Sequence, residues 1–492
     1  MNISYKKIGV ALLAAAAVVP VTQALAQTQS DAQAETVQQK IDDLSAQIQD
    51  LKRSTSSQYT DVQNQQASSV KVTLDNGRPT ISSANGDFTA AIRVLGQFDS
   101  AYYAQGDNAA LLPAANGPDL SSGANIRRAQ LGVQGKLFGD WSYFFNTEFG
   151  GSSGTETQGR IQSLYIQYDG LKPFGARIGA YPPAAGLEDS TSSSDTIFLE
   201  RAAPSDILRN SVGGDGRDAA SAFYAGDRFF AALSWTGGKV ADGAVFDEQN
   251  AALARASYLA YSDQDTKFVL SGSGAYLFKA ADATPGDNAT RTLTLSSAPE
   301  LTVDSTGTKL VSTGAISTNS LTVWGGEAGL QWQSFYGQGG YFNYHIDTRT
   351  LTPPAAPNLD FDGWYAQATW VLTGENRVYK TDTAAFSSPK PAAPFAFNGS
   401  GWGAWELAGR YSVVNLNDNT GSVGLATPFG GVRGGEQKIW TAGVNWYPNA
   451  ALRFALDYQN INIDRLGNSS PFVGLSVGQT IDAVSLRAQV SL

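Results

Sequence analysis

Residues 452–460 read LRFALDYQN, a stretch that alternates between apolar and polar side chains. The apolar set is Leu452, Phe454, Leu456 and Tyr458, and the polar set includes Arg453, Asp457 and Gln459. A side-chain period of two predicts a β-strand with one apolar face and one polar face. The question is which solvent the apolar face meets.

The same period recurs in four further stretches, at residues 92–102, 127–137, 141–149 and 484–492. A soluble β-sandwich alternates as well, so alternation alone does not decide. These stretches, however, reach the ~9–11 residues that a tilted membrane strand needs. Paired aromatic residues, as at Tyr102-Tyr103, Trp364-Tyr365 and Trp446-Tyr447, stand near strand ends and are typical of an interfacial girdle.

Strands in lipid must close into a barrel, because lipid offers no hydrogen-bond partners to a free edge. Short turns are expected at 139–140, 226–227 and 448–449, with longer polar loops at the other end. Residues 70–492 therefore predict an all-β, transmembrane antiparallel β-barrel of about 16 strands. Such a barrel has a water-filled lumen, and most inward polar residues simply line it.

The N-terminus indicates export. Lys6 and Lys7 precede the apolar run IGVALLAAAAVV, and Ala24-Leu25-Ala26 forms a small-x-small cleavage pattern. This predicts a secretory signal peptide at residues 1–26. An exported barrel belongs in the outer membrane of a Gram-negative bacterium, where outer-membrane lipid surrounds it.

A helical period follows the signal segment. Val37, Ile41, Leu44, Ile48 and Leu51 are spaced by four and three residues, which predicts a short periplasmic coiled-coil helix at 27–53. An amphipathic helix docked on its own chain is the alternative. Residues 54–69 are polar and predict a flexible linker. The helix could also contact the cell wall.

Composition excludes several classes. The net charge is −10, or −12 without the two lysines of the signal segment, which argues against nucleic-acid binding. The chain has no cysteine and only one histidine, His345, so we expect no thiolate or histidine metal site. No serine-hydrolase elbow or dinucleotide loop is present, so we expect neither an enzyme nor a cofactor.

Several stretches, which follow one another in the family's order along the chain, resemble the phosphate-selective porin O/P family of outer-membrane channels. They are RIGAYPPAAGLEDSTSSSDTIFLER (177–201), IRRAQLGVQGKLFGDW (126–141), SAPELTVDSTGTKLVSTGAI (297–316) and FDGWYAQATWVLTGENRVY (361–379). The resemblance implies a homotrimer of 16-stranded barrels, each with a loop folded into its lumen. Phe198 and Leu199 would then anchor that loop against the barrel wall.

The resemblance also implies an anion site, which carries over to Arg127, Arg128, Ser192, Ser193 and Arg201. Guanidinium groups match phosphate oxygens, and hydroxyl groups replace water of hydration. Strict alternation, however, directs only one of Arg127 and Arg128 into the lumen. For Arg201, an ion pair with Glu200 or Asp206 is the alternative role.

One departure from the family pattern weakens the expectation of phosphate selectivity. The family uses lysines near this loop, whereas residues 178–200 contain neither lysine nor arginine and carry four carboxylates. We therefore expect a passive diffusion channel for anions such as phosphate or related oxyanions. The alternative is a general or organic-solute porin without phosphate selectivity.

Overall fold

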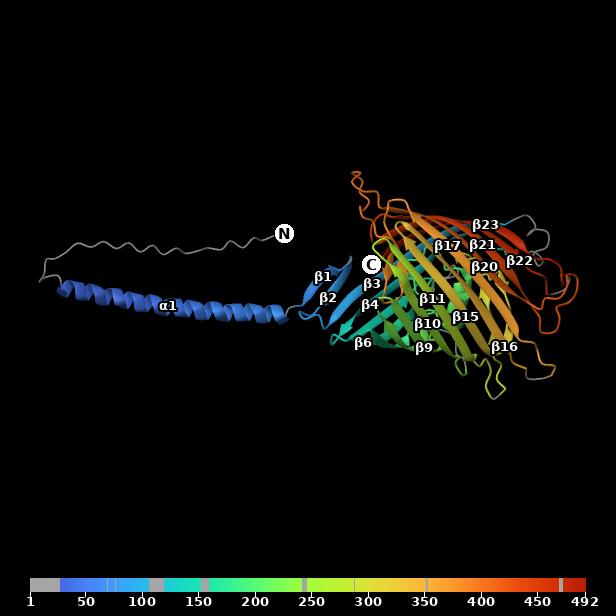
Figure 1. Ribbon diagram of the computed structural model, residues 1–492, viewed down its shortest axis with the longest axis horizontal. Coiled ribbons are helices and arrows are strands. Elements are labelled where there is room, and N and C mark those ends of the chain that lie inside the picture. The colour runs from blue at the N-terminus through green and yellow to red at the C-terminus, as the bar shows by residue number, and fades with distance from the viewer. Residues whose placement is uncertain are drawn as a thin grey trace. The chain divides into compact units, whose positions relative to one another are not determined.

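The computed structural model describes residues 27–68, 70–75, 77–105, 119–151, 159–240, 246–286, 288–350, 353–468 and 472–492 (Figure 1). The predicted signal peptide at 1–26 lies outside the described residues. The chain forms two compact units, with bounds 1–69 and 70–492. Each is considered by itself.

The described part of the first unit is one helix, α1 (Gln27–Ser68), of 42 residues. The prediction that residues 54–69 form a flexible linker is wrong, because the helix continues to Ser68. Residues 54–68 contain no proline or glycine to end it. The hydroxyl groups of Ser54, Ser57 and Thr60 also donate to carbonyls of the preceding turn, so they do not compete with the helix.

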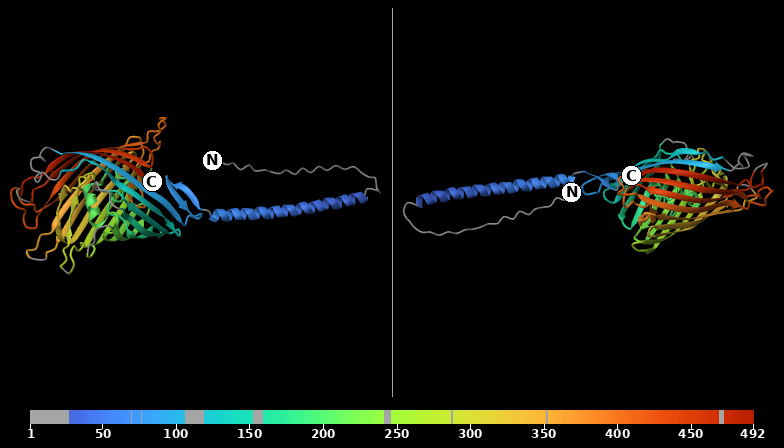
Figure 2. Two further views of the ribbon diagram at one scale, coloured as in Figure 1. Left: turned by 180° about the vertical axis from the view of Figure 1, so that it is seen from behind. Right: turned by 90° about the horizontal axis from the view of Figure 1, so that it is seen from above.

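The second unit contains a closed antiparallel barrel of 16 strands, as predicted (Figures 1 and 2). Closure comes from the last strand, which pairs with the first from Ile481↔Gln105 to Ser491↔Leu95. The barrel strands are β3 (Thr89–Gln105), β4 (Gly123–Leu137), β5 (Trp141–Glu148), β6 (Arg160–Leu171), β7 (Phe174–Ala180), β8 (Arg217–Ala225), β9 (Phe229–Lys239), β10 (Asn250–Ser262), β11 (Thr266–Lys279), β15 (Ile316–Trp332), β16 (Phe335–Thr348), β17 (Leu359–Val371), β20 (Ala404–Asp418), β21 (Val432–Tyr447), β22 (Leu452–Asp464) and β23 (Gln479–Ser491).

The predicted alternation is confirmed on β22, where Leu456 is 51% exposed and Asp457 only 2%. Apolar side chains thus cover the outside of the barrel, and polar ones turn inward. Among the described residues, neither helix is both long and apolar enough to cross a membrane as a helix.

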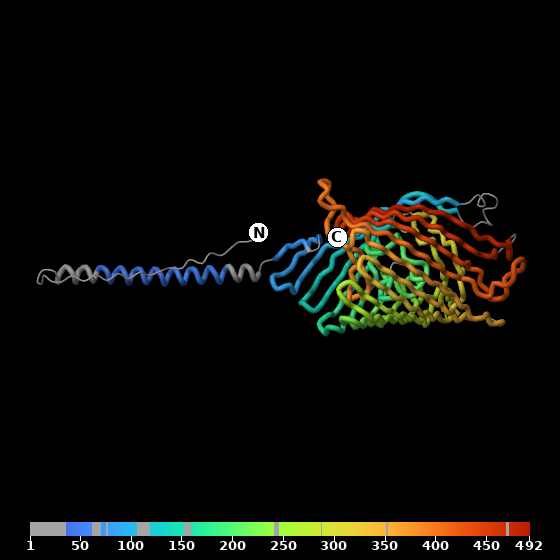
Figure 3. The backbone as a smooth tube through the Cα atoms, turned by 45° about the horizontal axis from the view of Figure 1, so that its top comes forward, coloured from blue at the N-terminus to red at the C-terminus, as the bar shows by residue number. Residues whose placement is uncertain are grey.

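The C-terminus and the hairpin of β1 (Lys71–Asp75) and β2 (Arg78–Ser82) lie at the same end of the barrel (Figures 1 and 3). Most strand connections at this end are short, which marks it as the periplasmic end. The exception is the segment 372–403, which contains β18 (Val378–Lys380) and β19 (Ala385–Ser387). The remaining short strands are β12 (Thr292–Leu293), β13 (Ser296–Ser297) and β14 (Val311–Ser312).

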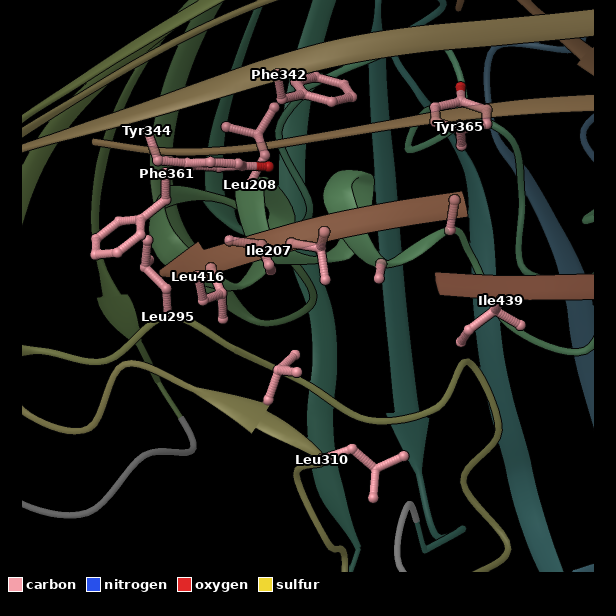
Figure 4. Packing of buried hydrophobic residues seen from close by; sticks show 14 of the residues in the cluster. Ile207, Leu208, Leu295, Leu310, Phe342, Tyr344, Phe361, Tyr365, Leu416 and Ile439 are labelled. Carbon is pink, nitrogen blue, oxygen red and sulfur yellow. The ribbon is translucent and has the colours of Figure 1, made fainter. Parts of the chain in front are cut away.

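Part of the lumen is filled by an apolar core. The loop between β7 and β8, residues 181–216, folds inward and contains α2 (Ala203–Val212). Ile207 and Leu208 of α2 lie near Tyr344 and Phe361 of the barrel wall (Figure 4). α2 and the neighbouring segment cover this part of the wall. Its inner side chains are therefore shielded from water and can be apolar.

Candidate functional site

The inward loop is fixed by its apolar pair. Phe198 and Leu199 are 1% and 2% exposed, which confirms that they are buried against the wall. The guanidinium carbon of Arg410 lies 4.6 Å from the centre of the Phe198 ring. Such a stacked cation holds the ring in place as well as excluding water from it.

Wall arginines also hold the loop backbone. Arg453 donates to the carbonyl oxygens of Thr196 and Ile197 at 2.5 and 2.6 Å. Arg487 donates to the carbonyl of Leu199 at 2.6 Å, and Arg410 donates to that of Glu200 at 2.9 Å. An irregular backbone inside a barrel needs such partners, because its carbonyls have no strand neighbour. These arginines are therefore committed to the loop.

Arg127 and Arg128 both face inward, so the expectation that alternation admits only one of them is wrong. Gln97 pairs with Arg128 but the next residue, Phe98, pairs with Ile126, which leaves Arg127 as the extra residue of a β-bulge. A bulge shifts the alternation by one position. Neither guanidinium contributes to the cavity described below.

Glu200 is the partner of both arginines. Arg127 binds it with two hydrogen bonds, of 2.6 and 2.9 Å, and Arg128 lies 3.6 Å from it. Arg487 approaches the same carboxylate at 3.3 Å. Burial alone would raise the pKa of Glu200, but Arg127 and Arg128 lower it well below the ordinary value. The carboxylate therefore stays charged and partly cancels the charge of the three arginines.

Arg201 and the serines lie on the other side of the loop. Arg201 donates to the carbonyl oxygens of Asp189 and Thr191, and its Nε is 4.0 Å from the Asp189 carboxylate. Its acidic partner is therefore Asp189, not the expected Glu200 or Asp206. The hydroxyl groups of Ser192 and Ser194 are 3.0 Å apart and accessible.

A cavity of about 640 Å³ runs between this loop and the wall formed by β3 to β9. Ser192, Ser193 and Arg201 contribute to its lining, so the structure brings together three of the five predicted site residues. Besides Arg209, which is ion-paired, three further cations line it: Arg93 on β3, Lys172 in the turn after β6, and Arg177 on β7.

Arg93, Lys172 and Arg177 were not predicted as site residues. Among the residues that the structure describes, none of the three forms a salt bridge with a carboxylate, although Asp195 acts electrostatically on Arg93. The sequence contained a signal for two of them: Arg93 has polar spacing within a predicted strand, and Arg177 opens the family-like stretch at 177–201. The signal was insufficient, because many inward charges in a barrel are paired.

Carboxylates line the cavity too. Asp189 and Asp215 are bound by Arg209, which lowers the pKa of Asp215 despite its burial. Asp169 accepts hydrogen bonds from Ser142 and Gln167. With the ion-paired groups set aside, the described lining has three cations and two carboxylates, Asp169 and Asp382. The local balance is positive although the chain as a whole is acidic.

Asp382 arrives on the β18–β19 hairpin, which enters from the periplasmic end. Arg255 of the wall donates to the carbonyl oxygens of Thr383 and Ala384 at 2.8 and 2.7 Å. Ser388 donates to Asp195 of the inward loop at 2.6 Å. The lining is thus made by two segments that are joined to each other and to the wall.

The only histidine, His345, lies away from this cavity, next to Asp347 and Asp360 on partly exposed strand ends. No group of three or more histidine, cysteine, aspartate or glutamate side chains within the described ranges is arranged to hold a metal ion. The cavity lining contains cations, carboxylates, hydroxyl groups and aromatic rings. Such groups bind and orient a solute by charge and contact.

A family model described as phosphate-selective porin O and P matches residues 105–492. Porin O of Pseudomonas aeruginosa is 26% identical over 367 residues, which cover 72% of this chain and 80% of that protein. An uncharacterized protein of Caulobacter vibrioides is also 26% identical, over 69% of this chain and 63% of its own length.

Solved structures with a similar course of the chain include an anion-selective porin from Comamonas acidovorans, with a TM-score of 0.46 at 9% identity. That comparison covers 82% of this chain and 98% of the other. OprB of Pseudomonas putida gives a TM-score of 0.49 at 10% identity, covering 83% and 95%.

Proposed function

The chain belongs to the phosphate-selective porin O and P family, and from this membership we propose that its barrel passes anions such as phosphate or related oxyanions by passive diffusion. It is an outer-membrane porin. The proposed role is transport without catalysis. In a water-filled passage with charged walls, selectivity depends on how strongly the walls bind each ion and on the energy barrier to its passage.

The observation that carries the proposal is the set of unpaired cations on the cavity wall. Arg93, Lys172 and Arg177 face a space bounded by a low-dielectric barrel, where a positive field acts strongly on anions. The acidic net charge of the chain does not oppose this, since distant surface charges are screened by salt.

We assign different roles to the five predicted site residues. Ser192 and Ser193 would replace water around a passing anion, and Arg201 would add to the field from behind the loop. Arg127 and Arg128 would act indirectly, by holding Glu200 and with it the loop. Under this assignment, anions pass along the wall formed by β3 to β9 and not past the β-bulge at Arg127.

The proposed assembly is a homotrimer embedded in outer-membrane lipid. The family resemblance supports the trimer, and the apolar outer surface of the barrel supports the lipid contact. Contact between α1 and the cell wall remains a proposal that rests on the separate helical unit.

A planar bilayer experiment tests the proposal. The mature protein is placed under a KCl gradient, and the reversal potential is recorded before phosphate is added. We expect a potential of anion-selective sign and a block of the chloride current by phosphate. Arg93→Gln and Arg177→Gln should each reduce the anion preference, whereas Arg228→Gln, in an exposed turn outside the cavity lining, should leave it unchanged.

The second candidate, a general or organic-solute porin, is favoured by the two carboxylates that share the lining, Asp169 and Asp382. The same recording separates the two functions. A cation-selective pore without phosphate block would overturn the proposed anion channel and leave the general porin.

A further inference from the structure

The wall that carries the unpaired cations is also rich in aromatic side chains. Phe144 on β5, Phe223 on β8 and Phe230 on β9 all line the cavity. The interior of a porin is ordinarily polar, so three phenylalanine rings on one inner wall need an explanation. They do not belong to the apolar cluster around α2. Phe230 and Phe223 pack with Ala384 of the β18–β19 hairpin, and the sides of Phe144 and Phe223 that face the cavity stay open.

Three aromatic rings, one of them Phe223, surround Arg177. Its guanidinium carbon lies 4.3 Å from the centre of the Tyr165 ring, 5.1 Å from that of Tyr181 and 5.9 Å from that of Phe223. Arg177 Nε donates to Gln167 at 2.7 Å. The two terminal nitrogens of Arg177 have no hydrogen-bond partner among the described residues.

The surroundings hold this arginine in a fixed direction. The hydroxyl group of Tyr181 is 2.5 Å from Ser221 Oγ, and it also donates to the Arg177 carbonyl at 3.3 Å. The rings of Tyr165 and Tyr181 pack edge to face with centres 5.5 Å apart. A guanidinium that is stacked and bonded at Nε presents its free terminal nitrogens as a fork, which matches a carboxylate.

A small hydrated oxyanion would use the fork but gain nothing from the rings. A solute that carries both a carboxylate and an aromatic ring would use both, since aromatic pairs are attractive beyond their burial of area. Apolar walls with a few oriented polar groups are also the usual form of a site for an organic ligand, at about 300–1,000 Å³. The cavity of about 640 Å³ falls within that range.

We propose that Arg177, with Phe144 and Phe223, forms a binding site for aromatic monocarboxylates on the conduction path. The proposal rests on the proposed function, because the carboxylate must first be admitted as an anion. Arg177 binds the carboxylate, the rings bind the aromatic part, and the neighbouring Arg93 draws the solute along the wall.

The test compares benzoate with acetate as blockers of the chloride current through the mature protein in planar bilayers. Benzoate should block at a concentration about 2- to 10-fold lower than acetate, the range expected for one aromatic contact. Phe223→Leu should remove this preference while the block by acetate stays. Phe223→Tyr, which keeps the ring, should preserve the preference and shows that the position tolerates change.

Phe145→Leu is the matched control, since Phe145 neighbours Phe144 on β5 but faces away from the lumen. Benzoate and acetate should block the Phe145→Leu channel as they block the unchanged channel. Equal block by benzoate and acetate in an anion-selective pore would overturn the aromatic site alone. A cation-selective pore that neither anion blocks would instead overturn the proposed function, and the site would fall with it.

Discussion

Glu200 is the carboxylate on which Arg127, Arg128 and Arg487 converge. Glu200→Gln removes the charge and leaves three neighbouring guanidinium groups with less compensation. Breaking a buried ion pair on one side typically costs about 3–5 kcal/mol, so we expect a clearly lower unfolding temperature in detergent. We also expect stronger anion preference in bilayers, because the cationic charge is no longer offset.

Asp227→Asn serves as the control, because Asp227 lies in an exposed turn. The double change Arg127→Met with Glu200→Gln should recover part of the lost stability, since the strongest pair is then removed from both sides. An unchanged unfolding temperature in Glu200→Gln would show that the cluster does not hold the loop.

At this scale the sequence predicted residue types better than residue positions. Arg127 and Arg128 were predicted as anion-site residues with only one of them facing inward, whereas the bulge that turns both inward depends on pairing with β3. Arg177 stands in the same family-like stretch as Arg201, yet only its aromatic neighbours, which include Tyr165 of β6 and Phe223 of β8, reveal its free terminal nitrogens. Such juxtapositions depend on contacts far apart in the chain.

Among the elements, the β18–β19 hairpin begins directly after a residue of a buried ion pair. Arg377 binds Glu406 of β20 with hydrogen bonds of 2.8 and 2.9 Å, and both side chains are almost fully buried. Arg377→Met would leave Glu406 uncompensated and loosen the hairpin, whose residues 381–383 line the cavity. We expect larger and noisier single-channel conductance.

The control for the hairpin is Lys390→Met, which removes an exposed cation from the same segment. Its conductance should match that of the unchanged protein. If Arg377→Met also conducts like the unchanged protein, the hairpin does not restrict the passage.

The inward loop should respond to pH through Glu188. Burial raises the pKa of Glu188 to about 8, although Arg410 partly opposes the shift. The folded chain therefore keeps a proton that the unfolded chain loses near its ordinary value of 4.5. This bound proton stabilises the folded chain fully below the unfolded pKa. As the pH rises toward 8, its contribution to the free energy of unfolding falls by at most about 1.4 kcal/mol per pH unit.

Glu188→Gln cannot ionise, so its unfolding temperature should fall less between pH 5 and pH 8 than that of the unchanged protein. Thermal unfolding followed by circular dichroism across this range measures the difference. Parallel curves for the two proteins would mean that Glu188 is not the titrating group.

For the whole molecule, the barrel was predictable because each strand repeats the same local pattern of apolar and polar residues. The filling of the lumen was not, because Phe361 and Tyr344 are apolar side chains on the inner face, against that pattern, and only α2 accounts for them. The end of α1 was also missed, since a polar composition does not by itself break a helix that lacks proline and glycine.

The separate helical unit leads to the last prediction. Its predicted seam, Val37, Ile41, Leu44, Ile48 and Leu51, is 49–67% exposed in the single chain. Apolar positions at heptad spacing gain stability when copies of a helix pack together. We therefore expect the α1 helices of neighbouring copies to associate, with Leu44 of one copy close to Leu44 of another.

The chain contains no cysteine, so one introduced thiol reports this contact without interference. Leu44→Cys should form disulfide-linked pairs of chains on mild oxidation of the membrane-embedded protein, as seen on non-reducing gels. Ala46→Cys places the thiol on the opposite side of the helix and should link far less. Equal linking at both positions would indicate random collision, and no linking at Leu44→Cys would place the seam against another surface.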